Sequence, residues 1–151
     1  MSLKINDDLP AFCLKDQEGN DFCSKDHVGT ANLVIFFYPK DFTPGCINEV
    51  CSFRDRYEEF QDIGAVVVGI SGDSEKSHQK FSKHYKLPFK LLSDKGNKVR
   101  KRFGVPNSFL GLLPGRETYI FNKEGKVIMV FNNMNGNVHV KKALSILKNN
   151  S

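Results

Sequence analysis

The chain has 151 residues, of which 40% are hydrophobic, and a formal net charge of +5. This composition excludes a disordered chain, and 12 Gly and 6 Pro without a period exclude a collagen-like one. The longest apolar run, Leu33 to Tyr38, is far shorter than the roughly 20 residues of a membrane span. The start, MSLKINDD, has no apolar stretch of a signal peptide. We expect one soluble intracellular domain over residues 1–151, in the cytoplasm or, if the chain is part of a longer precursor, in a plastid or the nucleus.

The positive charge is concentrated in one segment. Between Lys76 and Arg102 there are ten basic residues and a single acid, Asp94. Such a segment could bind nucleic acid or an acidic partner. No aromatic or glycine pattern of a nucleic-acid module accompanies it, so we expect a solvated helix face and no nucleic-acid partner.

The predicted elements alternate between strands and helices. In chain order, they are a hairpin of Phe12 to Lys15 and Asp21 to Ser24, a strand Asn32 to Tyr38, a helix that opens at Thr43-Pro44, a strand Ala65 to Ile70, a helix Ser74 to His84, a strand Phe89 to Leu92, a helix Lys98 to Phe103, a hairpin of Thr118 to Asn122 and Lys126 to Phe131, and a helix Val138 to Lys148. The two continuous apolar strands are typical of a sheet that is buried on both faces. The order predicts an α/β fold with a mixed sheet and helices on both faces.

The helix after Thr43 carries one apolar stripe, at Cys46, Val50, Phe53, Tyr57 and Phe60. With Thr43 as N-cap, Cys46 is the third residue of the first turn, where free backbone N–H groups and the helix dipole favour a negative charge. A thiol at that position ionises more readily than usual and becomes a nucleophile. The alternative is a small core cysteine, because Cys46 also lies on the apolar stripe.

Cys51 follows five residues later. In an ideal helix the two side chains diverge by about 140°, with Cα atoms about 8.7 Å apart, whereas a disulfide needs about 4.4–6.8 Å. A disulfide between Cys46 and Cys51 therefore requires the first turns of the helix to unwind. The alternative is an incidental surface thiol.

The four cysteines form neither a zinc pattern nor a Cys-x-x-Cys pair. We expect no metal and no cofactor, and a reducing compartment in which one or two thiols are reactive. Cys13 and Cys23 lie on opposite arms of the predicted hairpin and could face each other, but we expect both to be free thiols.

The segment FFYPKDFTPGCINEVCSFRD resembles the peroxiredoxins, with their Pro-x-x-x-Thr-x-x-Cys pattern at Pro39, Thr43 and Cys46. Its Thr-Pro-Gly-Cys-x-x-Glu-x-Cys form is similar to the peroxiredoxin Q and bacterioferritin comigratory protein subfamily. The later segment LLPGRETYIFNKEGKVIMVFNN is similar to the plant-type version. The resemblance covers essentially the whole chain and implies a thioredoxin-like fold.

The resemblance also implies the roles of individual residues. Cys46 would be the peroxidatic cysteine, which attacks hydrogen peroxide or organic hydroperoxides and becomes a sulfenic acid, and Cys51 the resolving cysteine. Thioredoxin or a glutaredoxin-like protein would reduce the resulting disulfide, and we expect the chain to be a monomer. The other implied site residues are Arg116, which holds the thiolate and the peroxide oxygens, Thr43, which donates a hydrogen bond to peroxide, and Pro39, which shields the pocket.

Glu49 lies one turn after Cys46 and could orient Arg116, or be an ordinary exposed acid. Two further classes of function remain open. A thioredoxin-like disulfide reductase would need a Cys-x-x-Cys pair that the chain lacks. A redox sensor or a nucleic-acid-associated protein could use the same fold without repeated turnover of peroxide.

Overall fold

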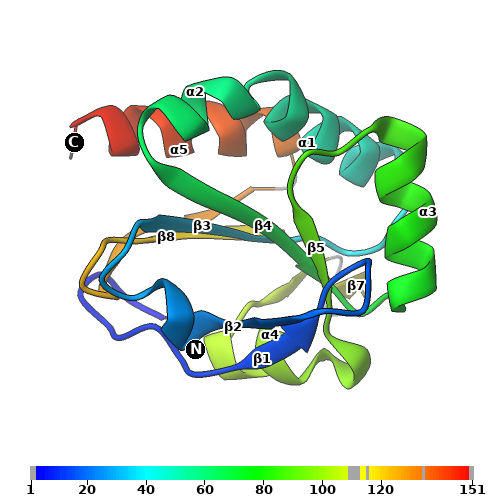
Figure 1. Ribbon diagram of the computed structural model, residues 1–151, viewed down its shortest axis with the longest axis horizontal. Coiled ribbons are helices and arrows are strands. Elements are labelled where there is room, and N and C mark those ends of the chain that lie inside the picture. The colour runs from blue at the N-terminus through cyan, green and yellow to red at the C-terminus, as the bar shows by residue number, and fades with distance from the viewer. Residues whose placement is uncertain (1–2, 109–112, 115, 134, 150–151) are drawn as a thin grey trace.

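The computed structural model describes residues 3–108, 113–114, 116–133 and 135–149. Their centre is a seven-stranded sheet with the strand order β2-β1-β5-β4-β3-β8-β9 (Figure 1). The strands are β1 (Cys13–Lys15), β2 (Asp21–Cys23), β3 (Asn32–Phe37), β4 (Ala65–Ser71), β5 (Lys90–Ser93), β8 (Glu117–Phe121) and β9 (Val127–Asn132). A separate two-stranded ribbon joins β6 (Asn107–Ser108) and β7 (Leu113–Pro114). Leu112 and Gly115, which belong to the segment LLPGRETYIFNKEGKVIMVFNN, lie outside the described residues.

The sheet is mixed, as the order of elements predicts. Strand β4 lies between β3 and β5 and is parallel to both, whereas β8 is antiparallel to β3 and β9 to β8. Strands β3 and β4 are buried along almost their whole length. Their continuous Val, Ile and Phe runs fit this position, because a central strand packs on both faces.

Five α-helices lie in the described part of the chain: α1 (Pro44–Asp55), α2 (Tyr57–Asp62), α3 (Glu75–Tyr85), α4 (Lys98–Phe103) and α5 (Gly136–Asn149). Short 3-10 turns occupy Ser24–His27 and Lys95–Asn97. The predicted helix after Thr43 is wrong in one respect, because Arg56, with φ −113° and ψ 14°, breaks it into α1 and α2. Its apolar stripe still packs on the core on both sides of the break, at Val50, Phe53 and Phe60.

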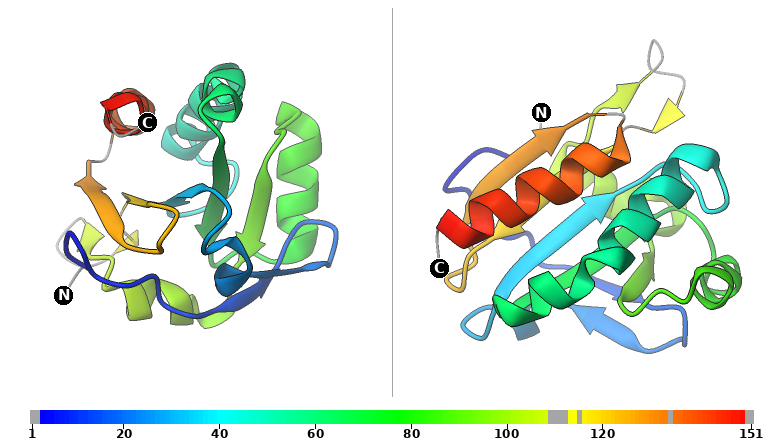
Figure 2. Two further views of the ribbon diagram at one scale, coloured as in Figure 1. Left: turned by 60° about the vertical axis from the view of Figure 1, so that its left-hand side comes forward. Right: turned by 90° about the horizontal axis from the view of Figure 1, so that it is seen from above.

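Helices cover both faces of the sheet. Helices α1, α2 and α5 lie together over one face, and Figure 2 shows α5 running beside α1 and α2. Helix α4 lies under the other face, on the side of the β1–β2 hairpin (Figure 1). Strand β3 supplies both cores, because Val34 and Phe36 point to the first face and Leu33, Ile35 and Phe37 to the second.

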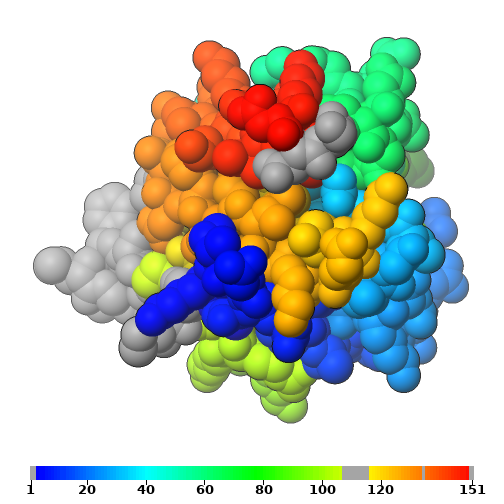
Figure 3. Space-filling view, turned by 90° about the vertical axis from the view of Figure 1, so that its left-hand side faces the viewer, coloured from blue at the N-terminus to red at the C-terminus, as the bar shows by residue number. Residues whose placement is uncertain are grey.

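The N-terminal segment before β1 crosses the β8–β9 hairpin. The amide of Asn6 donates to the carbonyl of Val127, and the amide of Leu9 donates to that of Gly125. In Figure 3 the dark blue N-terminal segment lies against the yellow and orange residues of this hairpin. Among the described residues, no helix is both long and apolar enough to cross a membrane.

The basic segment 76–102 is not wholly a solvated helix face. The Arg100 side chain of α4 is only 4% exposed, and its Nη2 donates to the carbonyl of Tyr38 at 2.9 Å. Its guanidinium also lies 5.6 Å from the centre of the Phe37 ring. The expectation of a solvated face is therefore wrong for Arg100, which belongs to the interior below the end of β3.

The predicted N-terminal hairpin is present, but its two cysteines are not free. Cys13 and Cys23 are directly opposite each other in the β1–β2 register, with Cα atoms 4.1 Å apart, and they form a disulfide. The neighbouring pair, Leu14 and Phe22, fixes that register because the Phe22 ring is buried in the core. The sequence alone predicted the hairpin but not the strand register that places the two cysteines opposite each other.

The disulfide should stabilise the fold through the unfolded chain. It closes a short loop, since the two cysteines are 10 residues apart. For such a loop the entropy lost by the unfolded chain corresponds to about 2–3 kcal/mol. We expect the Cys13→Ser/Cys23→Ser variant to lose that much free energy of unfolding in urea titrations. A reductant should lower the stability of the wild type and leave that of the variant unchanged. Equal stability of the variant and of the oxidised wild type would contradict the expectation.

Candidate active site

The candidate site begins where β3 ends and α1 starts. Thr43 is the N-cap of α1, with φ −86° and ψ 146°, and Pro44 is the first helical residue, as predicted. The Thr43 hydroxyl donates to the carbonyl of Lys40 at 2.8 Å and makes no capping bond to the helix. The side chain of Cys46 lies in the first turn and is fully buried. A negative charge on that sulfur would lie at the positive end of the helix dipole.

Arg116 reaches Cys46 from the side of β8, the strand next to β3. It precedes β8, and the pairing of Phe37 with Glu117 brings it to the end of β3. Its Nη2 donates to the Cys46 Sγ at 3.4 Å, and its side chain is 3% exposed. Gly45 makes room for this contact, because a Cβ there would lie 3.0 Å from the same nitrogen. The thiol therefore has a fixed cationic donor.

Glu49 lies on the far side of this guanidinium. Its Oε1 accepts a hydrogen bond from Arg116 Nη1 at 2.5 Å, and its side chain is fully buried. The alternative of an exposed helix acid is therefore wrong. Burial raises the pKa of Glu49 to about 7, against the opposing effect of Arg116.

His139 of α5 closes the site behind Glu49. Its Nε2 faces the carbonyl of Asn133 at 2.5 Å, and its Nδ1 lies 2.7 Å from the Thr118 hydroxyl. A carbonyl can only accept, so Nε2 carries the proton and Nδ1 accepts from Thr118. Burial lowers the pKa of His139 to about 4, which keeps the imidazole neutral. Helix α5 begins directly against α1, because a Cβ on Gly136 would lie 2.4 Å from the Glu49 Cβ.

Cys51 lies on the same helix and is a free, half-buried thiol. Helix α1 is continuous from Pro44 to Asp55, so both cysteines lie within one intact helix. Burial raises the pKa of Cys51, with Arg54 acting in the opposite direction. The structure thus holds Cys46 and Cys51 in the unlinked, reduced form.

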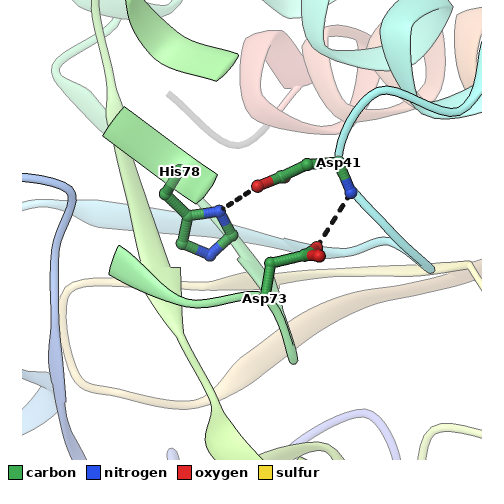
Figure 4. Close-up of side chains that lie close together, drawn as sticks. All are labelled: Asp41, Asp73 and His78. Atoms are coloured by element: carbon green, nitrogen blue, oxygen red, sulfur yellow. Dashed lines mark hydrogen bonds and ion pairs between the residues drawn. The ribbon is translucent and has the colours of Figure 1, made fainter. Parts of the chain in front are cut away.

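The loop that leads into α1 is held by a buried polar cluster (Figure 4). The Asp41 carboxylate accepts from the Tyr38 hydroxyl at 2.6 Å and from the Ser77 hydroxyl at 2.8 Å, and lies 2.7 Å from His78 Nδ1. The Asp41 amide donates to the Asp73 carboxylate at 2.8 Å. These bonds fix the backbone of Asp41 to α3 and to the end of β4.

The same cluster offers potential metal-ligand atoms, since those of Asp41, Asp73 and His78 lie within 4.8 Å of one another. Each of these side chains is already hydrogen-bonded within the protein. We therefore interpret the cluster as a support for the loop rather than as a metal site.

Phe42, next in the loop, has a left-handed backbone with φ 64°. This conformation is unfavourable for a bulky residue. Its ring packs 4.9 Å from the centre of the Phe81 ring and 6.4 Å from that of Tyr85, both on α3. The loop is thus attached to α3 twice, through Asp41 and through Phe42. These attachments fix the point at which α1, with Thr43 and Cys46, begins.

Sequence reasoning found part of this arrangement. Cys46, Glu49 and Arg116 are in direct contact; Thr43 and Pro39 lie, half-buried, in the segment that precedes them. It missed Asp41, His78 and His139, whose partners are distant in the chain. It also missed Arg100, whose buried charge interacts electrostatically with Cys46 and whose pKa burial lowers. No local pattern marks these residues.

A buried thiol in the first turn of a helix, next to a guanidinium and at the end of a central strand, defines a thiol-dependent redox protein. Comparisons with known proteins identify the family. The AhpC/TSA family matches residues 5–130. The chain belongs to this family, and within it to the peroxiredoxins of the peroxiredoxin Q type, which have a thioredoxin-like fold.

The most similar relatives include chloroplastic peroxiredoxin Q of Sedum lineare, with 53% identity over 92% of this chain and 75% of the relative. That of Populus jackii is 49% identical over 92% of this chain and 65% of its own length. The chain therefore spans about two thirds to three quarters of these relatives.

Among solved structures, peroxidoxin BcpB from Mycobacterium tuberculosis has a TM-score of 0.89 at 35% identity, covering 97% of both chains. Peroxiredoxin Q from Xanthomonas campestris has a TM-score of 0.85 at 31% identity, covering 91% of this chain and 90% of the other.

The neutral His139 predicts a pH dependence of stability. Its pKa in the folded protein, about 4, lies below its usual value of 6.5. The stabilising contribution is therefore present above pH 6.5 and lost as the pH falls towards 4. Relative to His139→Gln, we expect the wild type to lose about 3 kcal/mol of unfolding free energy between pH 7 and pH 4. Urea titrations at a series of pH values measure this difference.

Glu49 contributes in the opposite direction. Its pKa is raised from 4.5 to about 7, so that its effect on stability becomes less favourable as the pH rises through this range. Glu49 is present in both proteins, and its Oε2 lies 3.7 Å from His139 Nδ1, so the comparison removes the part of its contribution that does not depend on this contact. Parallel stability curves for the two proteins would show that His139 is not buried in its neutral form.

Proposed function

We propose that the chain is a thiol peroxidase, which reduces hydrogen peroxide and organic hydroperoxides with Cys46 as the peroxidatic cysteine. The observation that carries this proposal is the 3.4 Å hydrogen bond from Arg116 Nη2 to the Cys46 Sγ in the first turn of α1. The thiolate attacks one peroxide oxygen, the O–O bond breaks, and the leaving oxygen departs as water or an alcohol after protonation. Cys46 becomes a sulfenic acid.

The residues around the thiol have distinct roles in this step. Arg116 stabilises the thiolate and the charge that develops on the leaving oxygen. The Thr43 hydroxyl, which now donates to the Lys40 carbonyl, turns to donate to peroxide, and Pro39 limits the access of water. Glu49 orients Arg116 through the opposite edge of its guanidinium.

Cys51 then resolves the sulfenic acid. Its thiolate attacks the Cys46 sulfur, a disulfide forms, and the sulfenic oxygen leaves as water. This step requires unwinding of α1, because in the intact helix the two Cα atoms would be about 8.7 Å apart. A dithiol protein such as thioredoxin or a glutaredoxin-like protein reduces the disulfide and returns the helix to its reduced form.

The compartment and assembly belong to the same proposal. The relatives named above are described as chloroplastic, which supports a plastid over the other locations expected from the sequence. We propose that the chain works there as a monomer. Repeated turnover of peroxide distinguishes this enzyme from a redox sensor, which would react once per chain.

Replacing Cys46 with Ser should abolish turnover. A serine hydroxyl has nearly the same size but does not ionise at neutral pH. We expect no peroxide consumption above background in the presence of a dithiol reductant, with an unchanged circular dichroism spectrum. A Cys46→Ser protein that keeps appreciable turnover would remove Cys46 from the nucleophilic role.

Replacing Arg116 with Met should slow the reaction with peroxide about 10²-fold, because one preorganised donor to the developing charge is lost. Methionine keeps much of the side-chain length without the charge. Stopped-flow measurement of the rate constant with hydrogen peroxide is the test, and Lys101→Met, which removes an exposed cation of α4, is the matched control. Equal rates in the Arg116 variant and the control would exclude a role of Arg116 at the thiol.

Replacing Cys51 with Ser should separate the two half-reactions. Cys46 lies in the same environment, so its first reaction with peroxide should keep a nearly unchanged rate. Turnover with thioredoxin should collapse, and Cys46 should accumulate as sulfenic and sulfinic acid, which mass spectrometry detects. Normal turnover of this variant, or a bond from Cys46 to Cys13 or Cys23 in the oxidised wild type, would contradict the resolving role.

A further inference from the structure

The disulfide of the β1–β2 hairpin lies outside the chemistry described so far. We propose that Cys13–Cys23 is a second thiol–disulfide exchange site, which a dithiol protein with an acidic surface reduces independently of Cys46 and Cys51. Four features of the hairpin and its surroundings support this proposal.

First, the strand pairing keeps the two sulfurs together in either redox state. The turn between the strands is held by the Asp16 carboxylate, which accepts from the amides of Glu18 and Asn20 at 2.8 and 3.0 Å. The Gln17 side chain accepts from the Leu91 amide at 3.0 Å and donates to the Phe89 carbonyl at 3.2 Å, which attaches the turn to β5. None of these bonds involves sulfur, so the reduced hairpin keeps its register and can close again without a conformational change.

Secondly, the bond is accessible. Cys13 is exposed and Cys23 is half-buried, whereas Cys46 is fully buried. A thiolate carried by another protein can therefore approach the Cys13 sulfur from solvent. Exchange depends on such access as well as on the reactivity of the attacking thiol.

Thirdly, a groove of about 510 Å³ lies next to Cys13, between the hairpin and the start of α4. Phe12 and Val99 are apolar residues of its lining, and both are buried. A protein loop that carries a dithiol could rest there and place its thiol at the Cys13 sulfur.

Fourthly, the rim of this groove is positive. Two cations of the lining are paired with acids, Lys15 with Asp21 and Lys95 with Glu75. The remaining acid, Asp94, is buried and accepts from backbone amides of α4. The lining therefore holds four cations and three acids, and its one positive charge in excess lies at the exposed Lys98 and Arg102, which favours a partner that is acidic around its dithiol.

The exchange is balanced as two consecutive substitutions. The thiolate of the partner attacks the Cys13 sulfur, the Cys13–Cys23 bond breaks, and Cys23 leaves as a thiolate that takes up a proton. The second thiol of the partner attacks the mixed disulfide, and Cys13 leaves in the same way. Two electrons and two protons pass from the partner to the hairpin, and the partner is left with a disulfide.

The test uses the full chain with Cys46→Ser/Cys51→Ser, in which Cys13 and Cys23 are the remaining cysteines. Thioredoxin, kept reduced by its reductase and NADPH, is the probe, and maleimide mass tagging under native conditions is the readout. We expect two tagged thiols per chain within minutes and one NADPH oxidised per chain. A protein that stays untagged under native conditions, and is tagged only after unfolding in urea with dithiothreitol, would overturn the proposal and leave a purely structural bond. Because this variant has no peroxidase chemistry, the result does not depend on the function proposed above.

A second pair of variants tests the groove. In the same background, Lys98→Glu/Arg102→Glu should slow reduction by thioredoxin about tenfold at low salt, because the rim then repels an acidic partner. Lys141→Glu/Lys142→Glu on α5 makes the same change of net charge elsewhere and should have little effect. Reduction by dithiothreitol should be equal in all three proteins. Reduction by dithiothreitol but not by thioredoxin, or equal rates with thioredoxin in all three, would overturn the assignment of an acidic dithiol protein.

Discussion

The buried contact between Arg116 and Glu49 is the interaction on which the rest of the site depends. A guanidinium that is 3% exposed needs hydrogen-bond acceptors, and the fully buried Glu49 supplies one at 2.5 Å while the other edge of Arg116 faces the Cys46 sulfur. The two residues are 67 positions apart, and the pair exists because β8 lies beside β3, the strand that leads into α1. Glycine at positions 45 and 136 leaves room for Arg116 and Glu49, respectively, where a larger residue would place its Cβ against them.

Helix α1 has to satisfy two opposing demands. It must keep Cys46 buried next to Arg116, and in the proposed cycle its first turns must unwind so that Cys51 can reach the oxidised sulfur. The structure attaches the chain to α3 before these turns and interrupts the helix after them. Asp41 and Phe42 fasten the preceding loop to α3, and the break at Arg56 separates α1 from α2, so that unwinding of α1 need not be transmitted along one long helix.

The two cysteine pairs of the chain illustrate different relations between thiol chemistry and secondary structure. Cys46 and Cys51 are five residues apart in a helix, a spacing that separates them as long as the helix is intact. Cys13 and Cys23 are opposite each other in an antiparallel hairpin, a position that holds them together. A disulfide between the first pair would therefore require a conformational change, whereas the second pair is linked within the hairpin as it stands.

Local patterns in the sequence predict most of the elements and the position of Cys46 in the first turn of a helix. The apolar runs of β3 and β4, the Thr43-Pro44 start of α1 and the segment around Cys46 are all readable from neighbouring residues. Four features could not be predicted in this way: the burial of Glu49, the neutral state of His139, the place of Arg100 and the Cys13–Cys23 bond. These features arise from contacts across strand registers and between helices, and such contacts depend on how the elements pack rather than on the spacing of residues along the chain.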